Sequence, residues 1–443
     1  MSIITPPGHI LLILRRLKEN GHAAYLVGGC VRDAVMERPM RDWDIATSAA
    51  PLDIARLFRD AVMIGAKFGT VKVVIPRFAE GSAVQRQTPS NHNGAIIRNR
   101  RRDDITNFGS GKSEHGVMDE VQVTTFRTES EYLDGRHPAV VEFVSTLDED
   151  LSRRDFTINA MAYSINGRLI DLFGGLDDIS NRIIRCVGDP NTRFSDDALR
   201  MFRAYRFRAE LGFDIDKDTL CAIHERIDKA INISSERISD ELGKILMSQN
   251  PDVICEVIKC GLLGKYLSPE PGAHIPDLVD EACGTIKNIA KLPEESMLRW
   301  CVFCSVCIET KIIATAAQFL RKLNIDEKTV KICSLALSIR MFPEKRSAVK
   351  RLLAKHGTDI VRCAAAIHDV HIGAEHNAAI DSVAEIINSG ECFCLHDLAV
   401  SGRDLIQLGY TPGPQIGKFL DKLLKHVIDH PDENKRELLL EML

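Results

Sequence analysis

The feature that most constrains the fold is a change of periodicity near residue 150. Before it, short runs rich in β-branched and aromatic residues, such as VKVVI at 71–75 and VQVTTF at 121–126, are typical of strands. After Ser152, apart from LIDLF near Ile170, apolar residues recur at helical spacing as far as the C-terminus. The sequence therefore predicts an α+β chain, with a small sheet-containing head followed by helices.

Composition and the N-terminal sequence limit where such a chain can work. The formal net charge is -5, so contacts with nucleic acid have to rest on local basic patches. Thirteen cysteines and an N-terminus without the basic region and cleavage site of a secretory signal favour a cytoplasmic protein with reduced thiols. The longest apolar run near the start, Ile10 to Leu14, is far shorter than the roughly 20 residues that cross a bilayer, so we expect no membrane span.

Two aspartates mark a first candidate site, in the stretch YLVGGCVRDAVMERPMRDWDIAT from Tyr25 to Thr47. Asp42 and Asp44 are two residues apart on an expected strand, so their carboxylates project from the same face. Neighbouring carboxylates raise each other's pKa unless a cation is present, and Mg²⁺ prefers one or two carboxylates together with substrate phosphates. An Asp-x-Asp pair alone is more typical of a solvated strand edge, so this interpretation needs support from the surrounding residues.

That support comes from the residues upstream. We expect Gly28 and Gly29 to end a strand, where the lack of side chains lets a phosphate approach backbone N–H groups of the following helix. Arg32, one turn into that helix, can reach the same phosphates. A Gly-Gly pair alone is usually only a turn, but the combination with Arg32 and the two aspartates predicts a site for a metal-bound nucleoside triphosphate.

A second candidate site lies in the helical part, in DPNTRFSDDALRMFRAYRFRAELGF from Asp189 to Phe213. On a helix, Asp197 and Arg200 are three residues apart, so their side chains are neighbours that offer acceptors and donors respectively. Cytosine and adenine present an amino donor beside a ring-nitrogen acceptor, whereas uracil and guanine present a carbonyl acceptor beside a ring N–H. A fixed Asp–Arg pair can therefore select C and A and reject U and G.

The first stretch resembles the first motif of class II tRNA nucleotidyltransferases and bacterial poly(A) polymerases, within the polymerase-β-like superfamily. The resemblance implies that Asp42 and Asp44 are the catalytic residues and hold Mg²⁺. It also implies that Gly29 and Arg32, with the adjacent Gly28, bind the incoming nucleotide. The resemblance extends over nearly the whole chain, and its later motifs assign further residues.

RRDFTINAMAY, from Arg153 to Tyr163, is similar to the second motif of this family. Its Arg and Asp, here Arg154 and Asp155, lie near the ribose in the family, and such a pair suits a 2′-OH, which is both donor and acceptor. Standing alone, the pair would favour a salt bridge at a helix N-terminus. The family often has a further acidic residue on a later strand, but Gln122 occupies that position here, and an amide cannot help to neutralise a second cation.

The second candidate site is similar to the family's Glu-Asp-x-x-Arg motif, which acts as a protein template for the base. Asp196 replaces the Glu, while Asp197 and Arg200 match. By the same resemblance Arg203 and Arg206 help to hold the triphosphate, although their spacing alone fits a solvated basic stripe equally well. Further along, ISSERISDELGKIL resembles the end of the family's neck, where the ERI run either approaches the nucleotide or braces the fold.

The resemblance implies a polymerase-β-like nucleotidyltransferase head followed by an all-helical neck, body and tail. The expected bounds are 1–150 for the head with a flexible insertion at about 77–119, 151–245 for the neck with the nucleotide-selecting helix, 246–340 for the body and 341–443 for a tRNA-binding tail. The implied activity is template-independent addition of C, C and A to the 3′ end of tRNA from CTP and ATP, with release of pyrophosphate. The alternatives are a poly(A) polymerase, a partial CC- or A-adding enzyme and, from another class, an inactive RNA-binding protein with the same fold.

Other clusters point to competing functions. Three cysteines at three-residue spacing, from Cys301 to Cys307, favour packing in the core over a zinc or iron–sulfur site, because the segment reads as an apolar helix. His368 and Asp369 suggest a metal phosphohydrolase, but a structural role is favoured because no distant ligands can be assigned. Asp134 and Arg136 belong, by resemblance, to a flexible loop that helps to change specificity from C to A.

Overall fold

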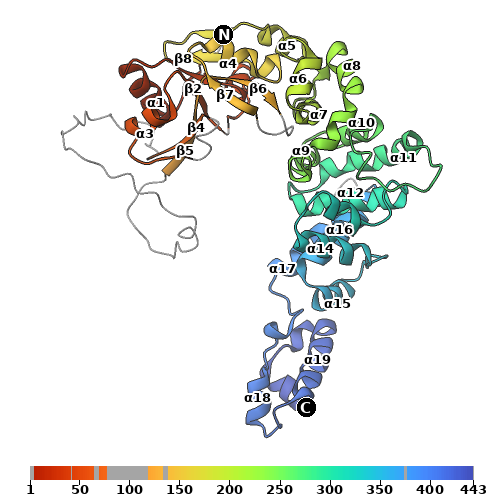
Figure 1. Cartoon of the computed structure of the whole chain (residues 1–443). Coiled ribbons are helices and arrows are strands. Elements are labelled where there is room, and N and C mark those ends of the chain that lie inside the picture. Colours follow the sequence, from red (N-terminus) through yellow and green to blue (C-terminus); the bar gives the residue numbers. More distant parts are fainter. Residues whose placement is uncertain are drawn as a thin grey trace. The chain divides into compact units, whose positions relative to one another are not determined.

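The computed structural model describes residues 4–40, 42–63, 69–76, 118–132, 138–373 and 377–442. The chain forms two compact units, Met1–Asp189 and Pro190–Leu443 (Figure 1). The insertion expected at about 77–119 lies outside the described residues, except that residues 118 and 119 already belong to strand β5 (Met118–Thr125). The expected specificity loop with Asp134 and Arg136 also lies outside the described residues.

A mixed sheet organises the first unit. Over the described residues it has the strand order β3-β4-β5-β2-β1-β8-β9. Its other strands are β1 (Ala24–Val27), β2 (Asp44–Thr47), β3 (Ala61–Val62), β4 (Thr70–Pro76), β8 (Met161–Ser164) and β9 (Leu169–Asp171). Strands β2 and β5 pair in parallel, and the other neighbours pair antiparallel. Strands β6 (Arg127–Tyr132) and β7 (Pro138–Phe143) form a separate hairpin.

The first unit extends further than the head expected from the sequence. That head ended at residue 150, whereas the compact unit ends at Asp189, because β8 and β9 join the sheet beside β1. After β9 the chain forms α5 (Gly175–Asn181) and β10 (Ile183–Ile184).

The two faces of the sheet bury different side chains. Leu26 and Ile45 pack in a core with α1 (Gly8–Glu19), α2 (Gly29–Val35) and α3 (Pro51–Leu57); Figure 1 shows α1 and α3 together beside the sheet. The next residues along the same strands, Val27 and Ala46, pack on the opposite face with α4 (Leu147–Ser152). Because strand residues alternate between faces, Asp44 shares the α4 face with Ala46.

The second unit is built from helices, as the periodicity predicts. They are α6 (Pro190–Asp196), α7 (Leu199–Leu211), α8 (Lys217–Glu225), α9 (Ser235–Met247), α10 (Val253–Lys259), α11 (Ile275–Lys287), α12 (Ser296–Glu309), α13 (Ala316–Lys322), α14 (Glu327–Leu337), α15 (Arg346–His356), α16 (Thr358–His371), α17 (Ala378–Asn388), α18 (Gly402–Gln407), α19 (Pro414–Asp429) and α20 (Arg436–Glu441). Between α7 and α8 lies the short strand β11 (Asp214–Ile215). None of the helices in the described ranges combines the length and apolarity that a membrane span needs.

The competing clusters have structural roles in this unit. The three cysteines from Cys301 to Cys307 lie on α12 and are buried in the core, which confirms the packing prediction. Asp369, at the end of α16, accepts hydrogen bonds from the backbone N–H groups of Ala379 and Ile380 at the start of α17, which confirms its structural role. Within the described residues, no group of three or more His, Cys, Asp or Glu side chains could hold a metal ion.

Candidate active site

A glycine turn joins β1 to α2, as the sequence predicts. Gly28 precedes the helix with φ 77°, in the region that favours glycine. A Cβ added at Gly28 would lie 3.0 Å from Nη1 of Arg154 and 3.9 Å from Oδ2 of Asp44. The turn, Arg154 and Asp44 therefore converge at one place on the α4 face of the sheet.

The carboxylate pair lies at the start of β2. The strand begins at Asp44, and Asp42 precedes it and is exposed, so the expectation that both residues lie on the strand holds only for Asp44. Burial raises the pKa of Asp44, the guanidinium of Arg154 opposes this, and the carboxylate of Asp42 raises it further. Gln122, at the position where the family often has a third acid, lies opposite Asp44 in the parallel pairing of β2 with β5.

These two carboxylates fit a divalent cation. Both supply hard oxygen ligands, and the Asp42 carboxylate contributes to the raised pKa of Asp44, as a nearby like charge does. A pair rather than a complete set of ligands is also what Mg²⁺ uses when substrate phosphates and water supply the rest.

Arg32 and Asp155 are linked through a residue that sequence reasoning missed. Arg32 lies on α2 and is 7% exposed; its Nη1 donates to Oδ1 of Asn159 at 2.8 Å, and its Nε donates to Asp33 at 2.9 Å. The Asn159 amide in turn donates to Oδ1 of Asp155 at 3.3 Å. The only signal for Asn159 was its place within RRDFTINAMAY, because its contact with Arg32 spans 127 residues of sequence.

Arg154 forms an ion pair with Asp150, a second residue that the sequence analysis did not single out. Its Nη2 donates to Oδ2 of Asp150 at 3.1 Å, four residues earlier and on α4. Its Nε is buried and has no hydrogen-bond partner among the described residues. A buried donor without an acceptor costs about 1–3 kcal/mol.

In the second unit, Asp197 lies between two helices rather than on one. Helix α6 ends at Asp196 and α7 begins at Leu199, which corrects the expectation that Asp197 and Arg200 share a helix. The Asp197 carboxylate accepts from the Leu199 N–H at 3.0 Å and from Nη2 of Arg237 at 2.8 Å. The ERI run, which contains Arg237, therefore braces Asp197.

Arg200 is anchored by α6. It is 8% exposed; its Nη1 donates to the Arg193 carbonyl at 3.0 Å and lies 3.5 Å from Oδ2 of Asp196. Asp196, which replaces the family's Glu, thus forms an ion pair with Arg200 of the same motif.

Arg203 and Arg206 are half-buried, which does not fit a solvated basic stripe. The Arg206 Nε lies 2.9 Å from Oε2 of Glu241, and its guanidinium lies 4.2 Å from the centre of the Phe207 ring. Arg203 lies 5.4 Å from the same ring. Both arginines are therefore held on one side of α7.

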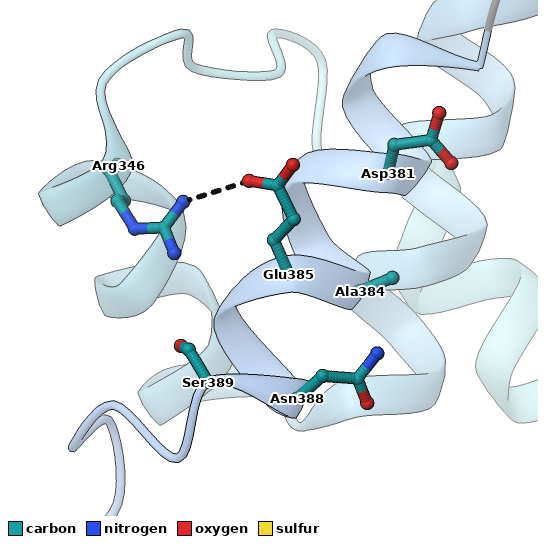
Figure 2. Close-up of a pocket in the computed structure, with 6 residues that line it drawn as sticks. All are labelled: Arg346, Asp381, Ala384, Glu385, Asn388 and Ser389. Carbon is teal, nitrogen blue, oxygen red and sulfur yellow. Dashed lines mark hydrogen bonds and ion pairs between the residues drawn. The ribbon is translucent and has the colours of Figure 1, made fainter.

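A pocket of about 700 Å³ lies elsewhere in the second unit, between α15 and α17 (Figure 2). Its lining includes side chains of both charges and Ala384, and Arg346 donates to Glu385 at 3.3 Å. None of the site residues expected from the sequence lines this pocket.

Together, the fold and the glycine–carboxylate site define a nucleotidyltransferase head of the poly(A) polymerase type. A family model described as the Poly A polymerase head domain matches residues 24–82 and 79–185. A model for the probable RNA and SrmB-binding site of polymerase A matches residues 212–272, and one for a putative tRNA nucleotidyltransferase domain 2 matches residues 293–443.

Similarity to named proteins narrows this class. The chain is 34% identical over 435 residues to a CCA-adding enzyme of Geobacillus sp., which covers 97% of this chain and 95% of that protein. It is 31% identical to a CCA-adding enzyme of Enterococcus faecalis, over 97% of this chain and 93% of that one. The solved structure of the Bacillus stearothermophilus CCA-adding enzyme in complex with CTP matches with a TM-score of 0.71 and 29% identity, over 99% and 98% of the two chains. The chain belongs to the family of CCA-adding enzymes.

Proposed function

We propose that this chain adds C, C and A to the 3′ end of tRNA, using CTP and ATP and releasing pyrophosphate. The observation that carries the proposal is the convergence of Gly28, Asp44 and Arg154, in which a carboxylate and a guanidinium nitrogen lie beside a turn without a side chain. Relatives named as CCA-adding enzymes match almost the whole length of the chain, and one of them has been solved in complex with CTP, which supports the choice of substrates.

We assign Mg²⁺ to Asp42 and Asp44. When bound there, the cation would supply positive charge beside the phosphate oxygens of the nucleotide. The 3′-hydroxyl of tRNA attacks the α-phosphate, and pyrophosphate leaves. Gly28 keeps the space between Arg154 and Asp44 open for the nucleotide.

Four further residues of the first unit bind the nucleotide in this proposal. Gly29 and Arg32 contact its phosphates. Arg154, whose Nη1 lies at the Gly28 turn, and Asp155 contact its ribose.

Base selection falls to the second unit. Asp197 and Arg200 recognise the amino and ring-nitrogen groups shared by cytosine and adenine, and their contacts with Arg237 and Arg193 hold them in place for this role. Arg203 and Arg206 bind the triphosphate, and residues 341–443 bind tRNA. A cytoplasmic location also belongs to the proposal, because all thirteen cysteines are free thiols, as expected in a reducing compartment.

The test is extension of a tRNA transcript that lacks CCA, with CTP alone, ATP alone and both. We expect two additions from CTP alone and a complete CCA end from both nucleotides. Long A tails would instead indicate a poly(A) polymerase, a missing C or A step would indicate a partial enzyme, and no extension would indicate an inactive RNA-binding protein.

Two substitutions test the assignment of Mg²⁺ to Asp42 and Asp44. Asp42→Asn and Asp44→Asn should each lose incorporation of CTP and ATP alike, by at least about a hundredfold. Asp53→Asn, which changes an aspartate on α3, serves as the control and should keep full activity. Persistent activity in both Asp42→Asn and Asp44→Asn would contradict the assignment of Mg²⁺ to these residues.

A further inference from the structure

A buried carboxylate lies behind the glycine turn and serves two consecutive arginines. Asp150 is 0% exposed. Its Oδ1 accepts from Nη2 of Arg153 at 2.6 Å and from Nε at 3.1 Å, while its Oδ2 accepts from Nη2 of Arg154 at 3.1 Å. Burial raises the pKa of Asp150, but the charges of the two arginines outweigh it and lower the pKa overall, so the group stays ionised at neutral pH.

The contact with Asp150 determines which part of Arg154 is left for a ligand. A guanidinium is planar, so fixing Nη2 also fixes the directions of Nη1 and Nε. Nη1 lies at the Gly28 turn, 3.0 Å from the position of an added Cβ. Nε is buried without a hydrogen-bond partner among the described residues. Nη1, which Asp150 leaves unused, therefore belongs to the candidate active site.

Without Asp150, Arg154 has another carboxylate within reach. A Cβ added at Gly28 would lie 3.9 Å from Oδ2 of Asp44. The charge of Arg154 also opposes the rise that burial causes in the pKa of Asp44. Asp150 and Asp44 thus both attract the guanidinium, and the hydrogen bond to Asp150 holds it at the Gly28 turn.

We propose that Asp150 is a positioning residue, which acts through Arg154 to fix the contact between the enzyme and the ribose of the bound nucleotide. This inference rests on the function proposed above, in which Arg154 contacts the ribose. Asp150 does not touch the nucleotide itself, and Arg153 supplies the second charge that keeps the buried carboxylate compensated.

The experiment compares CTP with 2′-deoxy-CTP in single additions to tRNA, with kcat and KM measured separately. Asp150→Asn keeps the shape of the side chain and removes its charge. We expect the KM for CTP to rise about tenfold and the preference for CTP over 2′-deoxy-CTP to fall about tenfold, with kcat at saturation changed less than about threefold. Asp150→Glu restores the charge and should recover part of the preference. Asp148→Asn, an exposed aspartate on the same helix, is the control and should match the wild type.

Arg154→Lys completes the test, because it leaves Asp150 in place and removes the planar fork. It should lose the same preference, and combining it with Asp150→Asn should add no further loss, since both changes act on one contact. A folded Asp150→Asn variant with an unchanged preference would overturn the inference. If that variant does not fold, an unchanged preference in Arg154→Lys overturns it instead. A wild type that extends no tRNA contradicts the proposed function itself, whereas an active wild type with an insensitive Asp150 contradicts only this inference.

Discussion

Gly28 shows how a single missing side chain can maintain an active site. A methyl group at this position would lie 3.0 Å from Nη1 of Arg154, and the backbone has φ 77°. We predict that Gly28→Ala lowers incorporation of CTP and ATP about a hundredfold or more, because Arg154 has to move out of the nucleotide site. Single-turnover extension of tRNA measures the loss.

Gly21→Ala is the matched control for this change. Gly21 has a similar φ of 85°, but an added Cβ there meets nothing within 4 Å. Both substitutions place an alanine at a positive φ and should therefore lower the free energy of unfolding, measured by urea unfolding. Equal activity of the two variants would show that the space beside Arg154 has no role.

A substitution at Arg237 tests whether the ERI run affects base choice or only braces the fold. It donates to Asp197 at 2.8 Å from helix α9. We predict that Arg237→Met increases misincorporation of UTP and GTP relative to CTP and ATP by about tenfold, because Asp197 loses the donor that orients its carboxylate. Arg321→Met, which breaks an exposed ion pair with Glu327, should leave base preference unchanged. An unchanged preference in Arg237→Met would favour a bracing role unrelated to base choice.

At the scale of elements, periodicity identified the strand–glycine–helix unit and the Asp44 strand, because alternation and helical spacing follow directly from burial. It placed Asp42 on the strand and Asp197 on the helix, and the structure has both residues just outside those elements. Element ends depend on capping and long-range contacts, which leave little trace in local pattern. Asp150 and Asn159 were missed for a related reason, since their importance comes from partners that only the folded chain brings together.

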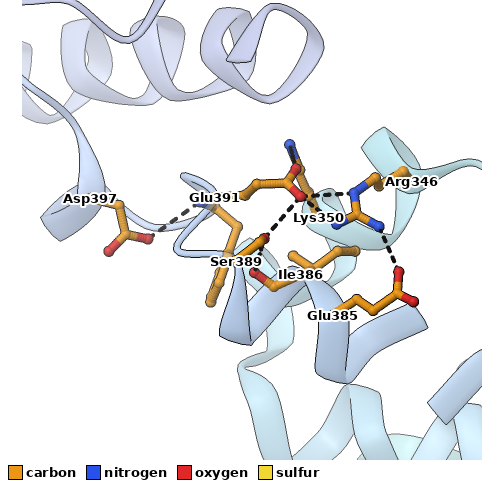
Figure 3. A network of polar contacts seen from close by, with 8 residues as sticks. Arg346, Lys350, Glu385, Ile386, Ser389, Glu391 and Asp397 are labelled. Atoms are coloured by element: carbon orange, nitrogen blue, oxygen red, sulfur yellow. Dashed lines mark hydrogen bonds and ion pairs between the residues drawn. The ribbon is translucent and has the colours of Figure 1, made fainter. Parts of the chain in front are cut away.

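Helices α15 and α17 meet through a polar network that has no counterpart in the sequence patterns (Figure 3). Lys350, only 2% exposed, lies 2.5 Å from Oε2 of Glu391, and Arg346 and Ser389 donate to the other oxygen. We predict that Glu391→Gln lowers the free energy of unfolding by about 1–3 kcal/mol, because Lys350 is left buried beside a neutral amide. Urea unfolding at neutral pH measures the change.

A variant of an exposed ion pair and the pH dependence of stability test whether the buried charge of Glu391 stabilises this network. Glu327→Gln removes an exposed partner of Arg321 and should leave the free energy of unfolding nearly unchanged. Hydrogen bonds from Arg346, with further ones from Lys350 and Ser389, lower the pKa of Glu391 to about 2 from its usual 4.5. Because the folded pKa is the lower one, the stabilisation is present above pH 4.5 and is lost as the pH falls toward 2. A stability difference between the wild type and Glu391→Gln that stays constant over this range would contradict the assigned charge.

For the whole molecule, the sequence predicted a sheet-containing head and a helical remainder, and both are confirmed. The compact unit extends past residue 150, where the head was expected to end, because β8 and β9, only four and three residues long, join its sheet. Strands of that length carry little periodic signal, although LIDLF near Ile170 departs from the helical pattern. Their place is set by antiparallel pairing of β8 with β1, which lies more than a hundred residues earlier, and of β9 with β8. The division of the helices into a neck, a body and a tail stays a prediction.

The proposed cation serves the reaction and not the stability of the fold. The cores of both units are apolar, and within the described residues no cluster of three or more potential ligands could hold a structural metal. The proposed cation instead lies on Asp42 and Asp44, at a place that needs substrate phosphates to complete it. Chelation with EDTA should therefore abolish incorporation of both CTP and ATP, and added Mg²⁺ should restore it.

The same treatment should shift the thermal unfolding midpoint by less than about 2 °C, since a weakly held ion adds little to the stability of the folded state. Asp44→Asn should unfold at the same temperature with and without EDTA. A large midpoint shift on chelation would mean that the metal holds the fold together, and activity that survives chelation would remove the metal from the mechanism. The two readings are independent, so one titration of EDTA against activity and melting distinguishes a catalytic cation from a structural one.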